Sequence, residues 1–210
     1  TLFRSVRDPR WGRVMESTGE DPLLNSRLAA AMVRGYQGEN LREDNWRVAA
    51  CVKHFAAYGG ALAGRDYNTV DMSERQLREM YLPGYKAGLD AGAKLVMTSF
   101  NTVDGIPATG NQWLFRDVLR NEFGFEGVVI SDWGAIKELI PHGVAKDEKQ
   151  AAELAIKAGV DIEMMTTCYP DYLKELLEEG RIAETLIDEA VMRILKLKNE
   201  LGLFENPYRG

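Results

Sequence analysis

Cysteine and histidine are scarce in this sequence, whose 210 residues include two of each. Two cysteines, Cys51 and Cys168, are too few for a framework of disulfide bonds, and their spacing is not that of a metal site. The sequence also lacks any run of about 18 consecutive apolar residues, so we expect no membrane-spanning helix. We therefore expect neither a disulfide-rich scaffold nor a metal centre.

An excess of positive charge is absent as well. The 26 Lys and Arg residues are scattered and are outnumbered by 32 Asp and Glu, which gives a formal net charge of −6. This balance argues against a protein that binds nucleic acid or anionic membranes. With 45% apolar and 28% charged residues, the composition is that of an average globular domain, which excludes a disordered, collagen-like or coiled-coil chain. The length suits one domain, or part of a larger one.

Four short apolar runs stand out in the chain. Each is rich in β-branched or other apolar residues without a clean alternation of two, which is typical of strands buried on both faces of a parallel sheet. Successive runs begin about 33 to 45 residues apart, which leaves room for a crossover helix between them. The runs are Val48–Phe55, Ala93–Phe100, Gly127–Trp133 and Gly159–Met165.

The stretches between these runs carry helix signals. Asp21 before Pro22 is an N-cap followed by proline at the first helical position, and Ser73 with Gln76 forms a capping box. Apolar residues then recur at helical spacing. Further helices are predicted over Asn111–Phe123, Asp147–Ala158, Asp171–Glu179 and Ala183–Leu201. This alternation of strands and helices predicts an α/β fold with a parallel sheet.

Polar residues follow the apolar part of three runs, as in Lys53-His54, Thr98-Ser99 and Ser131-Asp132. A (β/α)8 barrel gathers its catalytic groups at the carboxyl ends of its strands. A doubly wound sheet also binds ligands there, but no glycine-rich dinucleotide or phosphate-binding motif follows any run. We therefore predict a TIM-type (β/α)8 barrel with parallel strands and crossover helices.

The barrel is predicted to be partial. A complete barrel typically needs around 250 residues. We count four clear βα units and one further candidate strand at Leu2–Val6, so the first strands are expected to be missing from this chain. Residues 1–203 are interpreted as the later part of the barrel. Residues 204–210, with Pro207, are interpreted as the start of an interdomain linker.

Asp132 is the strongest candidate for chemistry. It follows Gly127–Ile130 at the end of a run, where the strand would hold its carboxylate toward the bowl of the barrel for nucleophilic attack or charge stabilisation. The structural alternative is that Asp132 caps the next turn. Trp133 would either stack on a sugar ring or pack in the core.

Lys53 and His54 form a second candidate pair. A buried lysine without a function is costly, whereas His54 alone is equally compatible with a hydrogen-bonded core residue. Residues 7–21 are rich in arginine and carboxylates, which predicts ion pairs and at least one arginine able to reach a substrate. Gly59–Tyr67 is interpreted as a loop over the same rim, and His142 as structural.

These segments together resemble glycoside hydrolase family 3, in particular its β-glucosidase and β-xylosidase members. The resemblance covers nearly the whole chain in the family's order. It implies a retaining, exo-acting β-glycosidase that removes terminal β-linked sugars without a metal or organic cofactor. The matching motifs are DPRWGRVMESTGEDP (8–22), VKHFAAYG (52–59), RDYNTVDMSERQLREMYLPGYKAGLDAG (65–92), MTSFNTVDGIPATGN (97–111), GFEGVVISDWGAIKEL (124–139) and GLFENPY (202–208).

The resemblance also implies roles for single residues. Asp132 matches the catalytic nucleophile, and Trp133 matches a residue that flanks the aglycone. Phe100 stands where many relatives have a tyrosine, whose hydroxyl would contact the nucleophile. The residues matched to substrate binding or to motifs around the pocket are Arg13, Lys53, His54, Met97 and Arg65.

Two parts that the family uses are expected to lie outside this sequence. An aspartate that binds the distal hydroxyls would precede Thr1, and the acid/base glutamate would follow Pro207 in a second domain. The loop 56–67 lacks the histidine of the N-acetylglucosaminidase branch, which sets that branch aside. An open parallel sheet has unpaired edges, so we expect a complementing chain or domain, or a homo-oligomer.

Three interpretations of function therefore stand. The chain is a fragment or subunit of a β-glycosidase, or a non-catalytic sugar-binding or structural remnant that needs a partner. A third is another barrel enzyme, such as an aldolase that uses Lys53 as a Schiff base. Family members are often periplasmic or secreted, but no signal peptide stands in this sequence, and the localisation stays unassigned.

Overall fold

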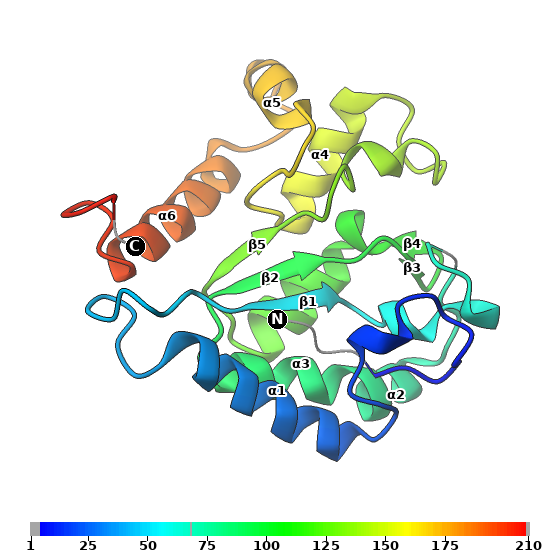
Figure 1. Cartoon of the computed structure of the whole chain (residues 1–210). Coiled ribbons are helices and arrows are strands. Elements are labelled where there is room, and N and C mark those ends of the chain that lie inside the picture. Colours follow the sequence, from blue (N-terminus) through cyan, green and yellow to red (C-terminus); the bar gives the residue numbers. More distant parts are fainter. Residues whose placement is uncertain (1–4, 68, 209–210) are drawn as a thin grey trace.

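The computed structural model describes residues 5–67 and 69–208. A parallel sheet of three strands lies at its centre, in the order β1 (Cys51–Phe55), β2 (Leu95–Thr98) and β5 (Val128–Ile130) (Figure 1). The strands are in register with Val52 opposite Val96 and Val96 opposite Val129. Three of the four predicted runs are therefore strands, and the α/β barrel-type fold with parallel strands is confirmed.

The fourth run, Gly159–Met165, is not a full strand, and that prediction was too long. Within the described residues its pairing with the sheet is one parallel bridge from Ile162 to Ile130, beside which the Asp161 N–H donates to the Val129 carbonyl oxygen at 2.8 Å. The reason lies in Asp161, whose carboxylate accepts the Val129 N–H at 2.8 Å. The Asp161 side chain thus occupies the Val129 N–H, a donor that a full neighbouring strand would bond through a backbone carbonyl oxygen. The strand pairing of this run is therefore reduced to one bridge.

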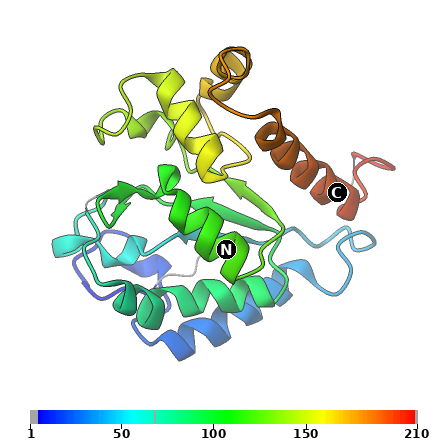
Figure 2. The same cartoon turned by 180° about the vertical axis from the view of Figure 1, so that it is seen from behind.

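Helices cover the sheet. The helix α1 (Pro22–Gln37) lies beside α3 (Leu82–Asp90) in both views (Figures 1 and 2). The short α2 (Glu74–Gln76) and the π-helix η4 (Leu77–Tyr81) lead into α3 without a break. The other longer helices are η6 (Trp113–Glu122), α4 (Glu148–Ala158), α5 (Cys168–Glu178) and α6 (Glu184–Glu200). Short 3-10 helices are η1 (Val14–Glu16), η2 (Tyr58–Gly60), η3 (Leu62–Gly64), η5 (Ala108–Gly110) and η7 (Lys137–Leu139).

The predicted caps hold in the structure. The Asp21 carboxylate accepts the Leu24 N–H at 2.7 Å at the start of α1, and Ser73 Oγ accepts the Gln76 N–H at 3.2 Å. Such caps satisfy backbone N–H groups that have no partner within the helix. The start of α5 differs from the prediction, because the helix begins at Cys168, three residues before the predicted Asp171. The Glu163 carboxylate accepts N–H groups from its first turn, a cap that is not visible in the local sequence.

Loops gather at the carboxyl ends of the strands (Figure 1). The hairpin of β3 (Thr102–Val103) and β4 (Ile106–Pro107) lies there, and Val70 bridges to Val103. A small apolar cluster beneath this rim includes Trp11, Tyr58 and Phe100. These buried aromatic side chains pack together and hold the loops at the carboxyl ends of the strands in place around the candidate site.

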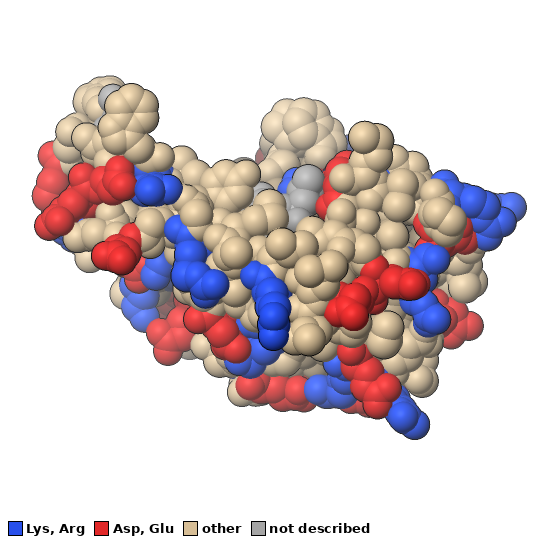
Figure 3. Space-filling view, turned by 60° about the horizontal axis from the view of Figure 1, so that its bottom comes forward, with Lys and Arg blue, Asp and Glu red and all other residues tan. Residues whose placement is uncertain are grey.

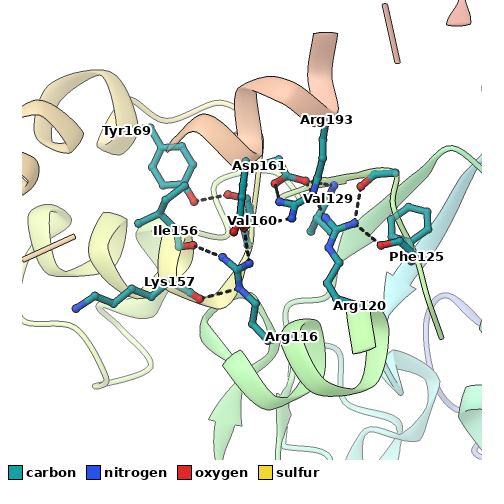
Figure 4. Close-up of polar contacts among 12 residues, drawn as sticks. Arg116, Arg120, Phe125, Val129, Ile156, Lys157, Val160, Asp161, Tyr169 and Arg193 are labelled. Atoms are coloured by element: carbon teal, nitrogen blue, oxygen red, sulfur yellow. Dashed lines mark hydrogen bonds and ion pairs between the residues drawn. The ribbon is translucent and has the colours of Figure 1, made fainter. Parts of the chain in front are cut away.

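A largely buried ion cluster around Asp161 lies near the start of β5 (Figure 4). Asp161 pairs with Arg120 of η6 at 3.0 Å and with Arg193 of α6 at 2.9 Å. Arg116 reaches the Ile156 and Lys157 carbonyl oxygens at the end of α4. Because these elements are far apart in sequence, the cluster ties α4, α6 and η6 to the sheet.

The ends of the chain leave two predictions open. Residues 2–4 of the candidate strand Leu2–Val6 lie outside the described residues. Val6 itself donates its N–H to Gly19 across a loop at 3.2 Å and is not in a strand. After α6 the chain makes turns to residue 208, and the linker assignment of 204–210 stays a prediction. None of the helices in the described part of the chain is long and apolar enough to cross a membrane.

Candidate active site

Asp132 lies just past the end of β5, at the rim where the loops gather. The strand end fixes its backbone, because the Asp132 N–H donates to Thr98 Oγ1 on β2 at 3.2 Å. Its Oδ1 accepts the N–H of the next residue, Trp133, at 2.7 Å, whereas the Asx turn of the structural alternative would bond the N–H two residues on. The carboxylate is mostly buried, and its other oxygen is engaged by a residue of β1.

That residue is His54, whose Nε2 lies 2.8 Å from Asp132 Oδ2. His54 is only 1% exposed and packs edge-on against Tyr58, with ring centroids 5.3 Å apart. The hydroxyl of Tyr85 donates to the His54 carbonyl oxygen at 2.6 Å. The peptide bond between Lys53 and His54 is cis. The imidazole is therefore held firmly against the carboxylate from both its ring and its backbone.

Opposing effects set the charge of Asp132. Burial alone would raise the pKa of its carboxyl group, because a charged form is less stable away from water. The hydrogen bond and charge of His54, the Trp133 N–H and the charge of Lys53 outweigh burial, so the pKa lies below its ordinary value of 3.8. Asp132 is therefore a carboxylate at neutral pH, the form that a nucleophile requires.

Lys53 and Met97 flank this pair on the neighbouring strands. Lys53 precedes His54 on β1, is partly buried, and is close enough for its charge to act on Asp132. Met97 is partly buried on β2 and lies opposite Ile130, two residues before Asp132. Both predicted residues thus lie on the strands next to the carboxylate.

Arg13 reaches the same area from the N-terminal loop. Its guanidinium makes two hydrogen bonds to Glu16, at 2.9 and 2.8 Å, as the ion-pair interpretation predicts. The same group lies over the Tyr58 ring, 5.5 Å from its centroid. Since Tyr58 also packs against His54, Arg13 is joined to the site through one aromatic ring.

Trp133 and Arg65 differ from the residues above in their exposure. Trp133 is 63% exposed, which rules out the core-packing alternative and leaves its ring open beside Asp132. Arg65 is exposed in the loop after the turn Leu62–Gly64. Among the described residues we find no contact between Arg65 and Asp132, so the role of Arg65 stays a prediction.

Sequence reasoning missed three residues around this carboxylate. Tyr58 is fully buried at the centre of the aromatic contacts, and Tyr67 packs on Phe100. Glu138 lies six residues after Asp132; burial and the Asp132 charge raise its pKa above the ordinary 4.5. The signal for Tyr67 was its place in the loop Gly59–Tyr67, which was interpreted as lying over the rim, and Tyr58 directly precedes that loop. The sequence did not indicate which aromatic rings would meet.

Within residues 5–67 and 69–208, no group of three or more His, Cys, Asp or Glu side chains is arranged to hold a metal ion. His142 contacts the Phe100 carbonyl oxygen through Nε2 at 3.1 Å. The arrangement offers one ionised carboxylate, a buried imidazole and two cations, which together suit a ligand with several hydroxyl groups.

These observations define an α/β barrel-type domain with its polar groups at the carboxyl ends of parallel strands, where enzymes of this fold place their active sites. The family model of the glycosyl hydrolase family 3 N terminal domain matches residues 5–197. The chain therefore belongs to glycosyl hydrolase family 3, as its motifs indicated.

Three similar proteins illustrate the relationship. The periplasmic β-glucosidase of Salmonella typhimurium is 48% identical over 96% of this chain and 26% of its own length. A β-xylosidase of Formosa agariphila is 39% identical over 94% of this chain and 29% of its own. The crystal structure of a β-glucosidase from Listeria innocua in complex with glucose superposes with a TM-score of 0.99 at 64% identity, over 100% of this chain and 30% of that one. The chain thus spans less than a third of the length of the relatives it matches.

Proposed function

We propose that this chain carries the nucleophile half of a retaining, exo-acting β-glycosidase of the β-glucosidase type. The observation that carries the proposal is the carboxylate of Asp132, mostly buried at the end of β5, held 2.8 Å from His54 and kept ionised there. The similarity to β-glucosidases and β-xylosidases supports the same reaction class.

In the first step Asp132 attacks the anomeric carbon of the terminal sugar. A bond forms between a carboxylate oxygen and that carbon, and the bond from the carbon to the aglycone oxygen breaks. The leaving oxygen takes a proton from a carboxylic acid. In the second step water attacks the same carbon, the same group removes the proton from the water, and Asp132 leaves as a carboxylate.

Binding of the sugar is assigned to the groups around Asp132. Lys53, His54 and Arg13 provide hydrogen-bond donors for hydroxyl groups of the terminal sugar. Trp133 offers an open ring on the aglycone side. Met97 lines the pocket from β2, and Arg65 contributes from the loop. No organic cofactor or metal takes part in this mechanism.

The acid/base group is proposed to come from outside this chain, from a complementing domain or chain or from a second copy in a homo-oligomer. A retaining mechanism needs its two carboxyl groups about 5 to 5.5 Å apart. General acid catalysis typically contributes about 10² to 10⁴-fold. The 210 residues alone are therefore expected to cleave unactivated glycosides poorly.

The test is covalent trapping in the natural full-length protein that carries this sequence. A 2-fluoro β-glucoside with a good leaving group should label one residue, and peptide mass analysis should find the sugar on Asp132. Asp132→Asn should abolish the labelling, whereas Asp117→Asn, an exposed carboxylate on η6, should leave it intact. Label on another residue, or label that persists in Asp132→Asn, would refute the assignment.

The source of the acid is tested with a second variant. Glu138→Gln removes a carboxyl group whose pKa is raised by burial and by the charge of Asp132. If the acid comes from outside this chain, Glu138→Gln should keep most of its activity on glycosides with poor leaving groups. A loss of that activity, with activity on aryl glucosides retained, would instead place the acid within this chain.

A further inference from the structure

Tyr67 is an aromatic residue near Asp132 that the mechanism leaves unused. Its ring packs against Phe100 with centroids 4.5 Å apart, and edge-on against Tyr58 at 6.5 Å. Tyr58 in turn packs against His54, which contacts Asp132. Tyr67 is therefore the outermost ring of a continuous aromatic wall that ends at the proposed nucleophile.

Exposure separates Tyr67 from the rest of this wall. Phe100 and Tyr58 are buried, whereas Tyr67 is 49% exposed. One side of its ring is covered by Phe100, and half of the side chain stays open at the rim. An exposed tyrosine with a rigid backing offers a large amphipathic contact area at low entropic cost, which suits the apolar face of a sugar ring.

The backbone of Tyr67 is held in an unusual conformation. Its φ of +60° lies in the left-handed region, which aromatic residues rarely adopt. The segment is fixed on both sides: Asp66 Oδ1 accepts the Trp11 Nε1–H at 3.0 Å, and the Val70 N–H donates to Thr102 at 3.1 Å. Strain of this kind persists where the surroundings impose it, and it is concentrated at ligand-binding sites.

The hydroxyl of Tyr67 stays protonated. Burial raises its pKa above the ordinary 10.0, and the charges of Glu138, Asp66 and Asp132 raise it further. A protonated phenol carries no charge, so the half-exposed ring can pack on the apolar face of a sugar without placing an anion there.

We propose that Tyr67 is a sugar-binding residue whose exposed ring stacks on the pyranose bound beside Asp132. This inference rests on the proposed function, because it takes the same terminal β-linked sugar as ligand. Tyr67 holds that ring in place and takes no part in bond making. Its removal should weaken binding of the sugar more than it slows the chemical steps.

The experiment measures glucose binding by calorimetry, and KM and kcat on an aryl β-glucoside, in the full-length protein. Tyr67→Leu keeps an apolar contact with Phe100 but lacks the flat ring. Tyr67→Gly suits the left-handed backbone, so its melting temperature should not fall. Both variants should bind glucose about tenfold more weakly, a change of roughly 1.4 kcal/mol, with KM raised by a similar factor and kcat less affected. Tyr67→Phe keeps the ring and should stay close to the parent.

Tyr36→Leu is the matched control, since Tyr36 is a similarly exposed tyrosine, at 45%, on α1. Glucose binding that is unchanged in Tyr67→Leu and Tyr67→Gly would overturn the inference. An equal loss of glucose binding in Tyr67→Phe would also overturn it, because the effect would then come from the hydroxyl and not from the ring. So would a loss of glucose binding in Tyr67→Leu and Tyr67→Gly that is accompanied by a lower melting temperature in both. Failure of the proposed function looks different, because the parent protein would then take no label on Asp132.

Discussion

At the scale of single residues, the contact between His54 and Asp132 has the greatest consequence. Burial favours the neutral form of the Asp132 carboxyl group, and without compensation the nucleophile would be protonated over a wider acidic range. The imidazole 2.8 Å away is the first of the effects that reverse this shift. His54 therefore has a role in the reactivity of Asp132 in addition to the proposed contact with sugar.

We expect His54→Gln to raise the pKa of Asp132. The acidic limb of kcat/KM reports the free enzyme's essential carboxylate, and that limb should move to higher pH when the lowering contact is removed. The measurement is the pH dependence of kcat/KM on an aryl β-glucoside. His142→Gln should leave the limb in place, because its ring contacts the Phe100 carbonyl oxygen and not the carboxylate. An unshifted limb in His54→Gln would contradict this account of the charge.

At the scale of elements, the helices are attached to the sheet by charges as well as by apolar packing. The Asp161 carboxylate accepts from the Val129 N–H, Arg120 and Arg193, and so joins β5, η6 and α6 (Figure 4). The same carboxylate limits the fourth run to a single bridge. Burying an ion pair costs free energy. Once the pair is buried, however, the removal of one partner leaves the other charge uncompensated.

Asp161→Asn should therefore destabilise the fold strongly. The variant leaves the largely buried Arg120 without its anion and Arg193 with Glu189 alone, and loss of one partner of a buried ion pair typically costs about 3 to 5 kcal/mol. Urea denaturation measures the free energy of unfolding. Asp188→Asn, an exposed carboxylate on the same helix α6, should change it by less than about 0.5 kcal/mol. A similar small change in Asp161→Asn would show that apolar packing alone attaches α6.

At the scale of the whole molecule, the described chain exposes surfaces that other parts of a barrel normally cover. The sheet ends at β1, which pairs only with β2 among the described strands. Large apolar side chains are exposed along two helices: on α1 Leu23, Leu24, Leu28 and Tyr36, and on α6 Val191, Met192 and Leu195. On the face shown in Figure 3, acidic and basic side chains are interspersed around a broad uncharged area.

These surfaces predict that the 210 residues expressed by themselves self-associate, because an unpaired strand edge and apolar helix faces favour contact between copies. Light scattering should give a mass that rises with concentration. Met192→Lys combined with Leu195→Lys should reduce the association while leaving the circular dichroism unchanged. The full-length protein is the reference, since its remaining segments are proposed to cover the same surfaces. A monomer at all concentrations would contradict this prediction.

Local pattern was sufficient for much of this molecule. Apolar runs predicted β1, β2 and β5 because strands buried on both faces need continuous apolar sequence, and Asp21 and Ser73 marked helix starts because their side chains bond the next turn. The position of Asp132 after β5 followed from the same logic. The family motifs then indicated membership of glycosyl hydrolase family 3, which the family model confirms.

Only the tertiary structure decided which distant groups meet. Asp161 replaces strand pairing, Glu163 starts α5 early, and Tyr58 links Arg13 to His54. None of these contacts is visible in the sequence as a periodic pattern or a local motif. Each joins residues whose proximity depends on how the sheet, helices and loops pack. The sequence by itself determined three strands, the main helices and the carboxylate at the end of β5, whereas packing determined the charge of that carboxylate and the aromatic wall beside it.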